Sequence, residues 1–407
     1  MVYNSRVNWS GWILIMASAS VGGGRPNKIA MPCRARSGSL IVQRAGKRAH
    51  PTPSSTETMM RYYQGRHPFY CGVDLHARKM YVSVVDEAGT LVQQRNLDAG
   101  PERFLSLIRP YRTGLVVGCE CMFAWYWLAD LCRDEGLDFV LGHALYMKAI
   151  HGDKSKNDRI DSEKIARLLR GGMFPPAYVY PREMRATRDL LRRRSHLVRM
   201  RTDAIAHVVN TTSQYNLPAF DKKLRNAANR EGVAEQFPDP SVRRMIESDL
   251  SLCDHLDEQI RTLELDLVRS ARVDDPQAYQ RLQTIPGVGK VLALVLLYEL
   301  HDVGRFADVR NFVSYCRLVR PKHESNGKTT SAAKKKKIGS APLRWALGEA
   351  ACLMLREVPE AKRLVARLEK KHGKAKALAI LAAKIARAVY WMLKRKEAFD
   401  VTKCFKP

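Results

Sequence analysis

The feature that most restricts the possible folds is a change of pattern at Tyr70. From Tyr70 to Gln93, short runs rich in β-branched and aromatic residues alternate with turns, the runs lying at 70–74, 80–85 and 90–93. Runs of this length between glycine-containing or polar turns are typical of neighbouring antiparallel strands. The pattern therefore predicts a three-stranded meander at the start of a domain.

The residues after the meander alternate between helical and strand patterns. The expected elements are a helix near 102–107, a strand at 115–117, a helix through 125–131, a strand at 139–141 and then two short helices. Three strands followed by alternating helices and strands is the order of a ribonuclease H-like domain. We predict an α/β domain of this kind over residues 68–180.

Four acidic residues in this domain lie where a metal site would need them. Asp74 ends the first strand, Glu120 ends the fourth, and Asp158 and Asp161 are about one helical turn apart on one face. Paired Mg²⁺ ions that clamp a phosphodiester need hard carboxylate ligands from several elements. Singly, Asp158 also suits a helix N-terminus and Glu120 a surface strand end. Together the four predict a Mg²⁺ site, with Mn²⁺ as a possible substitute.

The charge balance points to a polyanionic partner. Lys and Arg number 69 against 41 Asp and Glu, a formal charge of +28. Such an excess favours nucleic acid or an anionic membrane surface. The sequence has no run approaching the ~18 apolar residues of a membrane span. Its nine scattered cysteines indicate a reducing cytoplasm.

The middle of the chain, residues 183–272, has the pattern of two long helices. Apolar residues recur every seven positions from Leu190 and from Leu191, and again between Leu256 and Leu267. This predicts a coiled coil, formed either within one chain or between two. The arginines that flank the first apolar stripe form either a solvated helix face or, as we favour, a nucleic-acid contact; they are Arg188, Arg192, Arg193, Arg194, Arg199 and Arg201.

Residues 278–400 are expected to form an almost wholly helical domain. A Pro-Gly-Val-Gly-Lys sequence, with Gly287, Gly289 and Lys290, precedes an apolar helix. This turn is similar to a helix-hairpin-helix, whose backbone amides receive a phosphate, although plain helix capping explains it too. The predicted fold class is therefore α/β plus all-α.

In these motifs the chain resembles the insertion-sequence-110 family of transposases. The resemblance rests on Gly72–His76, the strand end at Glu120, the stretch 156–166 and a C-terminal stretch from Pro321 to Arg344. It implies a first domain similar to the Holliday-junction resolvase RuvC, with Asp74, Glu120, Asp158 and Asp161 as the DEDD metal ligands.

The same resemblance implies a nucleophile in the C-terminal domain. Ser325 corresponds to the family's catalytic serine, with Asn326 standing between it and Gly327 where the family usually has Ser-Gly. Ser331 and Ser340 are alternatives at a less suitable spacing from Pro321. The basic residues of this stretch, expected to contact nucleic acid, are Lys328, Lys334, Lys335, Lys336 and Lys337.

The resemblance also implies the reaction and its partners. Such a recombinase excises and inserts its own element, guided by a structured bridge RNA that pairs with donor and target double-stranded DNA. Family members act as dimers that assemble into tetramers, in the bacterial cytoplasm at the nucleoid and not at a membrane. A junction-resolving nuclease, or a non-catalytic nucleic-acid-binding scaffold, would also account for the basic charge and the acids.

Residues 1–67 differ from the rest of the chain. Residues 1–58 contain one acidic residue, Glu57, together with glycine- and proline-rich runs. We predict a disordered extension or a mis-called start, with the native start at Met59 or Met60. A short signal peptide around Trp12–Met16 is the second interpretation.

Overall fold

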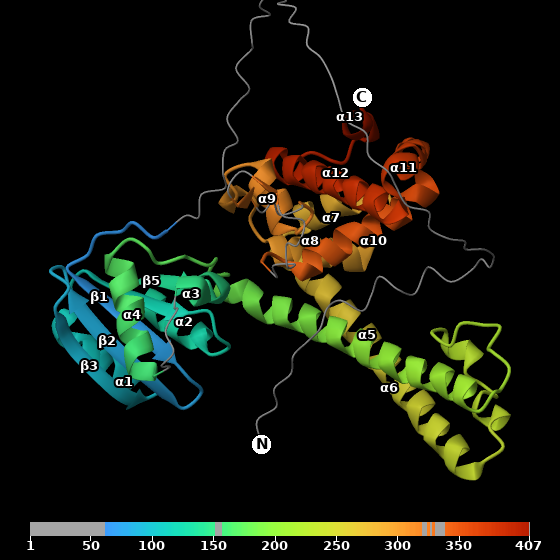
Figure 1. Cartoon of the computed structure of the whole chain (residues 1–407), viewed down its shortest axis with the longest axis horizontal. Helices are drawn as coiled ribbons and strands as arrows, with labels where there is room; N and C mark the ends of the chain where they lie inside the picture. Colours follow the sequence, from blue (N-terminus) through green and yellow to red (C-terminus); the bar gives the residue numbers. More distant parts are fainter. Residues whose placement is uncertain (1–61, 151–156, 320–323, 326–327, 330–337, 407) are drawn as a thin grey trace, which may run out of the picture. The chain divides into compact units, whose positions relative to one another are not determined.

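A computed structural model describes residues 62–150, 157–319, 324–325, 328–329 and 338–406 (Figure 1). The predictions for residues 1–61 lie outside this range. None of the described helices is long and apolar enough to cross a membrane.

The N-terminal domain is built on a five-stranded mixed sheet. Its strands are β1 (Phe69–Leu75), β2 (Lys79–Asp86), β3 (Leu91–Asp98), β4 (Leu115–Glu120) and β5 (Asp138–Gly142). They lie in the order β3-β2-β1-β4-β5. The first three form the predicted antiparallel meander, whereas β4 and β5 run parallel to β1. This confirms the ribonuclease H-like order.

Helices cover both faces of this sheet. They are α1 (Pro101–Ile108), the 3₁₀ helix η2 (Arg109–Tyr111), α2 (Trp125–Asp134), α3 (Ala144–Ile150) and α4 (Asp158–Arg170). Phe104 of α1 and Leu128 of α2 pack on one face with Cys71 and Val73 of β1. Ile165 of α4 packs on the other face, which α4 crosses in Figure 1.

Residues just before β1 and just after α4 also pack on this domain. The Tyr63 amide donates to the Phe174 carbonyl at 2.9 Å, and the Tyr63 ring packs against the α4 side of the sheet. Residues after α4 return along β5, where Ala177 N donates to Leu141 O at 2.6 Å. Both segments therefore belong to the domain.

Two long helices form the middle of the chain. They are α5 (Arg182–Gln214) and α6 (Pro240–Asp274), joined by a loop with the 3₁₀ helices η3 (Ala227–Asn229) and η4 (Ala234–Gln236). Near the start of α5, Leu191 lies in one core with Leu267, and farther along Val208 lies in another with Ile246. The two helices therefore run antiparallel and pair within one chain, one of the two arrangements that the sequence left open.

The remaining residues form a helical domain, as predicted. Its elements are α7 (Pro276–Gln283), α8 (Lys290–Leu300), η5 (Val303–Arg305), α9 (Val309–Tyr315), β6 (Glu324–Ser325), β7 (Lys328–Thr329), α10 (Ala341–Glu357), α11 (Pro359–His372), α12 (Lys374–Arg395) and α13 (Val401–Phe405). Every residue of α8 from Leu292 to Leu300 is buried, so α8 is its central helix. Phe405 of α13 packs on this core, which extends the domain past residue 400.

Gly287 has a structural role in the turn before α8. Its φ is +82°, and a Cβ there would lie 2.7 Å from the Met354 amide nitrogen of α10. Only glycine combines a left-handed backbone with so close an approach. This position therefore fixes the α7–α8 turn against α10.

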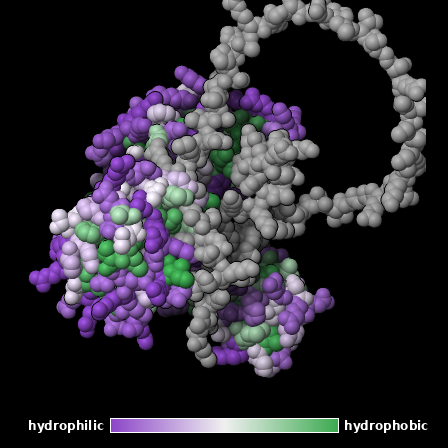
Figure 2. Space-filling model, turned by 60° about the vertical axis from the view of Figure 1, so that its left-hand side comes forward, coloured by the Kyte–Doolittle hydropathy of each residue, from purple (hydrophilic) through white to green (hydrophobic). Residues whose placement is uncertain are grey.

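Hydrophilic residues cover most of the described surface on the face shown in Figure 2. Apolar residues form small areas among them. This distribution is ordinary for a folded chain whose apolar side chains fill its cores.

Candidate active site

Two of the predicted acids end neighbouring parallel strands and face the same side of the sheet. Side chains alternate along a strand, so Asp74 shares a face with Gly72, and Glu120 shares a face with Gly118. Gly72 and Gly118 are paired in the register of β1 and β4. The carboxyl groups of Asp74 and Glu120 are therefore placed side by side on the face that α4 covers.

The two glycines allow α4 to approach this face closely. A Cβ at Gly72 would lie 2.0 Å from the Ser162 carbonyl oxygen, and one at Gly118 would lie 2.5 Å from Leu169. Any larger side chain at Gly72 would have to move the α4 backbone. The absence of side chains at Gly72 and Gly118 thus sets the distance between α4 and the sheet. It thereby also sets the position of the acids on the first turns of α4.

Polar contacts fix α4 along the sheet. The buried Ser83 and Ser162 hydroxyls are 2.8 Å apart, and Gln94 Nε2 donates to Ser83 Oγ at 3.0 Å. Gln94 Oε1 in turn accepts from Arg159 Nε at 2.7 Å. Strands β2 and β3 thereby hold the helix in one register.

The start of α4 is encoded locally. Asn157 is its N-cap and accepts a hydrogen bond from the Arg159 amide at 3.0 Å. Asp158 and Asp161 lie in the first turn, where the helix dipole favours negative charge. Both interpretations of these acids are therefore compatible, since a carboxylate suited to the helix end remains available to a cation.

The structure brings Asp74 and Asp158 together around a histidine. His76 Nε2 lies 3.5 Å from Asp74 Oδ2 and 3.6 Å from Asp158 Oδ2. Among the described residues, these three offer ligand atoms that all lie within 4.8 Å of one another. Glu120, on the neighbouring strand, and Asp161, one turn along α4, are outside that group.

His76 is the site residue that sequence reasoning missed. His76 ends the Gly72–His76 stretch on which the resemblance partly rests, but the sequence assigned it no role. The one available signal was its position two residues after Asp74, which keeps it at the same sheet edge.

The donor set fits a divalent metal ion. Carboxylate oxygens are the ligands that Mg²⁺ and Mn²⁺ prefer, and imidazole nitrogen suits iron, nickel, copper and zinc. Asp74 is largely buried, with 13% of its side chain exposed, whereas Asp158 is 56% exposed. The two carboxylates therefore differ in kind, one being a shielded ligand at a strand end and the other an accessible ligand on a helix.

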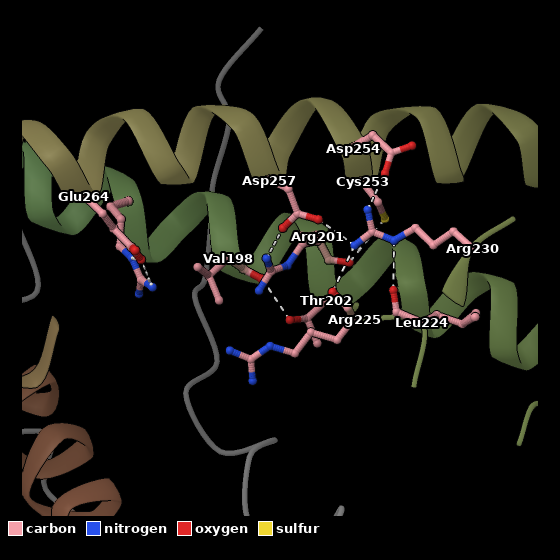
Figure 3. Close-up of polar contacts among 11 residues, drawn as sticks. Val198, Arg201, Thr202, Leu224, Arg225, Arg230, Cys253, Asp254, Asp257 and Glu264 are labelled. Atoms are coloured by element: carbon pink, nitrogen blue, oxygen red, sulfur yellow. Dashed lines mark hydrogen bonds and ion pairs between the residues drawn. The ribbon is translucent and has the colours of Figure 1, made fainter. Parts of the chain in front are cut away.

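Several of the predicted nucleic-acid-binding arginines already have carboxylate partners. Arg188 and Arg192 both bond Glu299 of α8, Arg192 through Nε at 2.7 Å. Arg194 pairs with Glu264 of α6. Arg201 pairs with Asp257 of α6 (Figure 3). These contacts place Arg188, Arg194 and Arg201 in the packing of α5, with about a tenth of each side chain exposed. Arg193 is exposed and Arg199 is half-buried.

Asp257 is shared with a second arginine that secures the loop between the two helices. Arg230 bonds Asp257 Oδ2 at 2.6 Å and the Leu224 carbonyl at 2.8 Å, and only 4% of its side chain is exposed (Figure 3). Its second carboxylate partner is Asp254. The pKa of Asp257 lies below its ordinary value because the two guanidinium groups outweigh the effect of burial.

Comparison with known proteins agrees with this geometry. The pattern of a transposase family, that of the DEDD transposases of IS110 elements, matches residues 71–216, from β1 to the end of α5. A second pattern, described as the IS116/IS110/IS902 transposase family, matches residues 279–366, from α7 into α11. Both patterns occur in the order of the two domains.

The chain belongs to the IS110 family of transposases.

Curated relatives resemble the transposase over most of its length. The transposase of insertion sequence element IS1111A from Coxiella burnetii is 25% identical over 338 residues, which are 81% of this chain and 90% of that protein. A probable family 20 transposase from Pseudomonas aeruginosa is 27% identical over 348 residues, covering 83% of this chain and 98% of that protein. The transposase of IS1328 from Yersinia enterocolitica is 27% identical over 266 residues, 64% of this chain and 76% of that protein.

Family membership makes the transposase a DNA-processing enzyme and indicates that it uses a divalent metal. The cluster of Asp74, His76 and Asp158, at the end of β1 and the start of α4, offers ligands for such a metal ion. DNA is accordingly its substrate class.

The predicted serine lies on a short hairpin in the C-terminal domain. β6 and β7 pair antiparallel, with Ser325 opposite Lys328. Lys334, Lys335, Lys336, Lys337 and Ser331 lie outside the described residues. Ser340 is buried and caps α10, its Oγ accepting from the Leu343 amide at 3.3 Å.

The segment that carries this hairpin is closed at its base. The Ser340 amide donates to the Tyr315 carbonyl at 2.8 Å, and Arg317 Nε donates to the Gly339 carbonyl at 2.8 Å. Two hydrogen bonds therefore join residues 315–317 to residues 339–340, which lie at the two ends of the segment.

The predicted phosphate-binding turn is accessible. Gly289 is the N-cap of α8 in an extended conformation, and a Cβ there would meet nothing within 4 Å. Lys290 beside it is exposed. Of the three residues predicted here, Gly287 is explained by packing, while Gly289 and Lys290 face open space.

Proposed function

We propose that the transposase excises its own insertion sequence and inserts it elsewhere, guided by a structured bridge RNA that pairs with donor and target DNA. The observation that supports this most is the meeting of Asp74 and Asp158 around His76, on elements far apart in the sequence. The second family pattern supports it further, because residues 279–366 include Ser325 and the turn before α8.

The acids would hold Mg²⁺, or Mn²⁺ in its place. Asp74 and Asp158 are the central ligands of this proposal, with Glu120 and Asp161 reaching the same edge from β4 and α4. Bound there, the metal would supply Lewis acidity to a phosphodiester oxygen. The residues themselves position the scissile phosphate at the end of the sheet, where β1, β4 and α4 are held rigidly.

Ser325 is the proposed nucleophile. Its Oγ attacks a DNA phosphorus atom, an Oγ–P bond forms, and the P–O bond to one deoxyribose breaks. The serine proton leaves with the released deoxyribose hydroxyl. The phosphoserine bond conserves the energy of the phosphodiester, so a hydroxyl of another strand can rejoin the DNA by reversing the step.

Contact with nucleic acid is assigned to accessible cations. We place Arg192, Arg193, Arg199 and Lys290 in this group. From the sequence alone we add Lys328 and Lys334–Lys337 to the proposed nucleic-acid contacts. Arg188, Arg194 and Arg201 would act indirectly, because their ion pairs hold α5 in place. We further propose that protomers dimerise and pair into tetramers.

An adduct assay tests the proposal. Protein purified without nuclease treatment is mixed with DNA carrying the element's ends and Mg²⁺, then digested for mass spectrometry. We expect a nucleotide attached to the peptide containing Ser325. Ser325→Ala should abolish both adduct and strand exchange, and prior RNase treatment should abolish them in the wild type. Ser340→Ala, at the residue capping α10, is the matched serine control, with the adduct retained.

Other outcomes identify the competing functions. Cleavage that persists in Ser325→Ala but requires Asp74 would mean a junction-resolving nuclease. An adduct that survives RNase would leave the serine chemistry intact and remove the guide RNA. Intact DNA under all conditions would indicate a non-catalytic scaffold.

A further inference from the structure

The loop between β4 and α2 presents an aromatic side chain to solvent beside the active-site acids. This loop, Cys121–Ala124, directly follows Glu120. Phe123 is 75% exposed and its neighbour Met122 is 41% exposed. Among the described residues, Phe123 is the most exposed aromatic side chain. Phe123 and Met122 are thus two adjacent apolar side chains left exposed directly after the strand end that carries Glu120.

The loop is anchored on both sides of Phe123. The Cys121 amide donates to the Gly142 carbonyl at 2.9 Å, and the Met122 amide donates to the Glu120 carbonyl at 2.7 Å. On the other side, Trp125 is 6% exposed and lies under the Arg185 guanidinium, 4.7 Å from the ring centroid. Phe123 is therefore held outward by a fixed backbone.

Positive charge lies next to this loop. The Arg185 guanidinium of α5 lies 4.7 Å from the Trp125 ring centroid and 5.1 Å from the Tyr126 ring centroid, directly after the loop. Farther along α5, Arg192 has 47% of its side chain exposed, although it pairs with Glu299. Acids for a metal and an exposed ring thus occur together at the end of β4, and an arginine of α5 lies beside the helix that follows the loop.

We propose that Phe123, supported by Met122, stacks on a nucleobase of the DNA strand whose phosphodiester lies at the acids. This rests on the proposed function, because it assumes that DNA occupies that site. Aromatic faces bind unstacked bases of any sequence, and the loop that carries Phe123 begins directly after Glu120, at the strand end where the phosphate would lie. A protein partner bound to Phe123 is the less suitable occupant. It would also cover the end of β4, where Glu120 has to contact the DNA.

The contact is tested by photo-crosslinking. The probe is a DNA duplex with an unpaired thymine tract in which thymines are replaced by 5-iododeoxyuridine, bound in Ca²⁺ so that strand cleavage does not interfere. Mass spectrometry should locate a crosslink in the peptide containing Phe123. Phe123→Ala should remove that crosslink and weaken binding of the probe about tenfold, the scale of one lost base stack. Phe123→Trp should retain both, since indole also stacks.

Tyr215→Ala is the matched control, because Tyr215 is an exposed aromatic at the end of α5. It should leave crosslink and affinity unchanged. The inference is overturned if Phe123→Ala binds the probe as tightly as the wild type, or if it changes only the oligomeric state in sedimentation. A Phe123 crosslink in a protein that fails to cut DNA in Mg²⁺ would support the contact while rejecting the proposed reaction.

Discussion

Replacing Asp74 with Asn is expected to reduce metal-dependent DNA strand cleavage about a thousandfold, the scale for losing a group that acts on the transition state. Asn keeps the shape of the side chain but removes the charge that a divalent cation needs. Rates are measured on DNA carrying the element's ends, in Mg²⁺ and in Mn²⁺. DNA binding, measured in Ca²⁺, should persist, because the looser coordination of Ca²⁺ supports binding better than chemistry.

Asp98→Asn is the control for this variant. Asp98 also ends a strand of the same sheet, but it is exposed and pairs with Lys79 at 2.7 Å. Its cleavage rate should equal that of the wild type. An equal loss of cleavage in both variants would mean that any Asp→Asn change at a strand end disrupts the sheet. Unimpaired cleavage by Asp74→Asn would exclude Asp74 from the site.

Replacing Glu299 with Ala is expected to lower the free energy of unfolding by about 3–5 kcal/mol, the cost of leaving buried charge unpaired. The Glu299 side chain is 1% exposed and accepts from Arg188 at 3.2 Å and from Arg192 at 2.7 Å. Its backbone carbonyl accepts from the Tyr180 hydroxyl at 2.7 Å. These contacts join the C-terminal domain to the start of α5 and to the residues leaving the sheet. Urea denaturation provides the measurement.

Glu360→Ala is the matched control. Glu360 forms an exposed pair with Arg363 on the same helix. Exposed pairs of this kind contribute at most about 1 kcal/mol, so stability should hardly change. A Glu299→Ala variant as stable as Glu360→Ala would show that the buried network does not hold the domains.

The ion pairs of Glu299 also predict how the free energy of unfolding depends on pH. Burial raises the pKa of Glu299, but the hydrogen bonds and charges of Arg192 and Arg188 outweigh it, so the pKa lies below its ordinary value of 4.5. Its contribution is therefore complete above that ordinary value and is lost as the pH falls through the lowered pKa. This loss on acidification should be missing from Glu299→Ala.

The acids at the strand ends could be predicted because strand pattern and chemistry coincide there. Asp74 and Glu120 each follow an apolar run, and the alternation of side chains assigns them to one face. The spacing of Asp158 and Asp161 assigned these two to one turn of a helix. What the sequence did not reveal is that paired glycines, Gly72 and Gly118, let that helix approach the acids.

The arginines of α5 show why other parts could not be predicted. A run of charge on a helix has no visible partners when the partners come from distant elements. Arg188 and Arg192 meet Glu299, and Arg201 meets Asp257, each more than fifty residues away. His76 went unassigned for a related reason, since its significance depends on Asp158 reaching it across the fold.

Three segments far apart in the sequence should converge on one divalent metal ion. Iron(II) substituted for Mg²⁺, with ascorbate and peroxide, generates radicals that cut the polypeptide next to the bound ion. We predict cuts near Asp74, near Glu120 and near Asp158, all suppressed by excess Mg²⁺ and absent from Asp74→Asn. Cuts confined to one of these segments, or located elsewhere in the chain, would contradict the account.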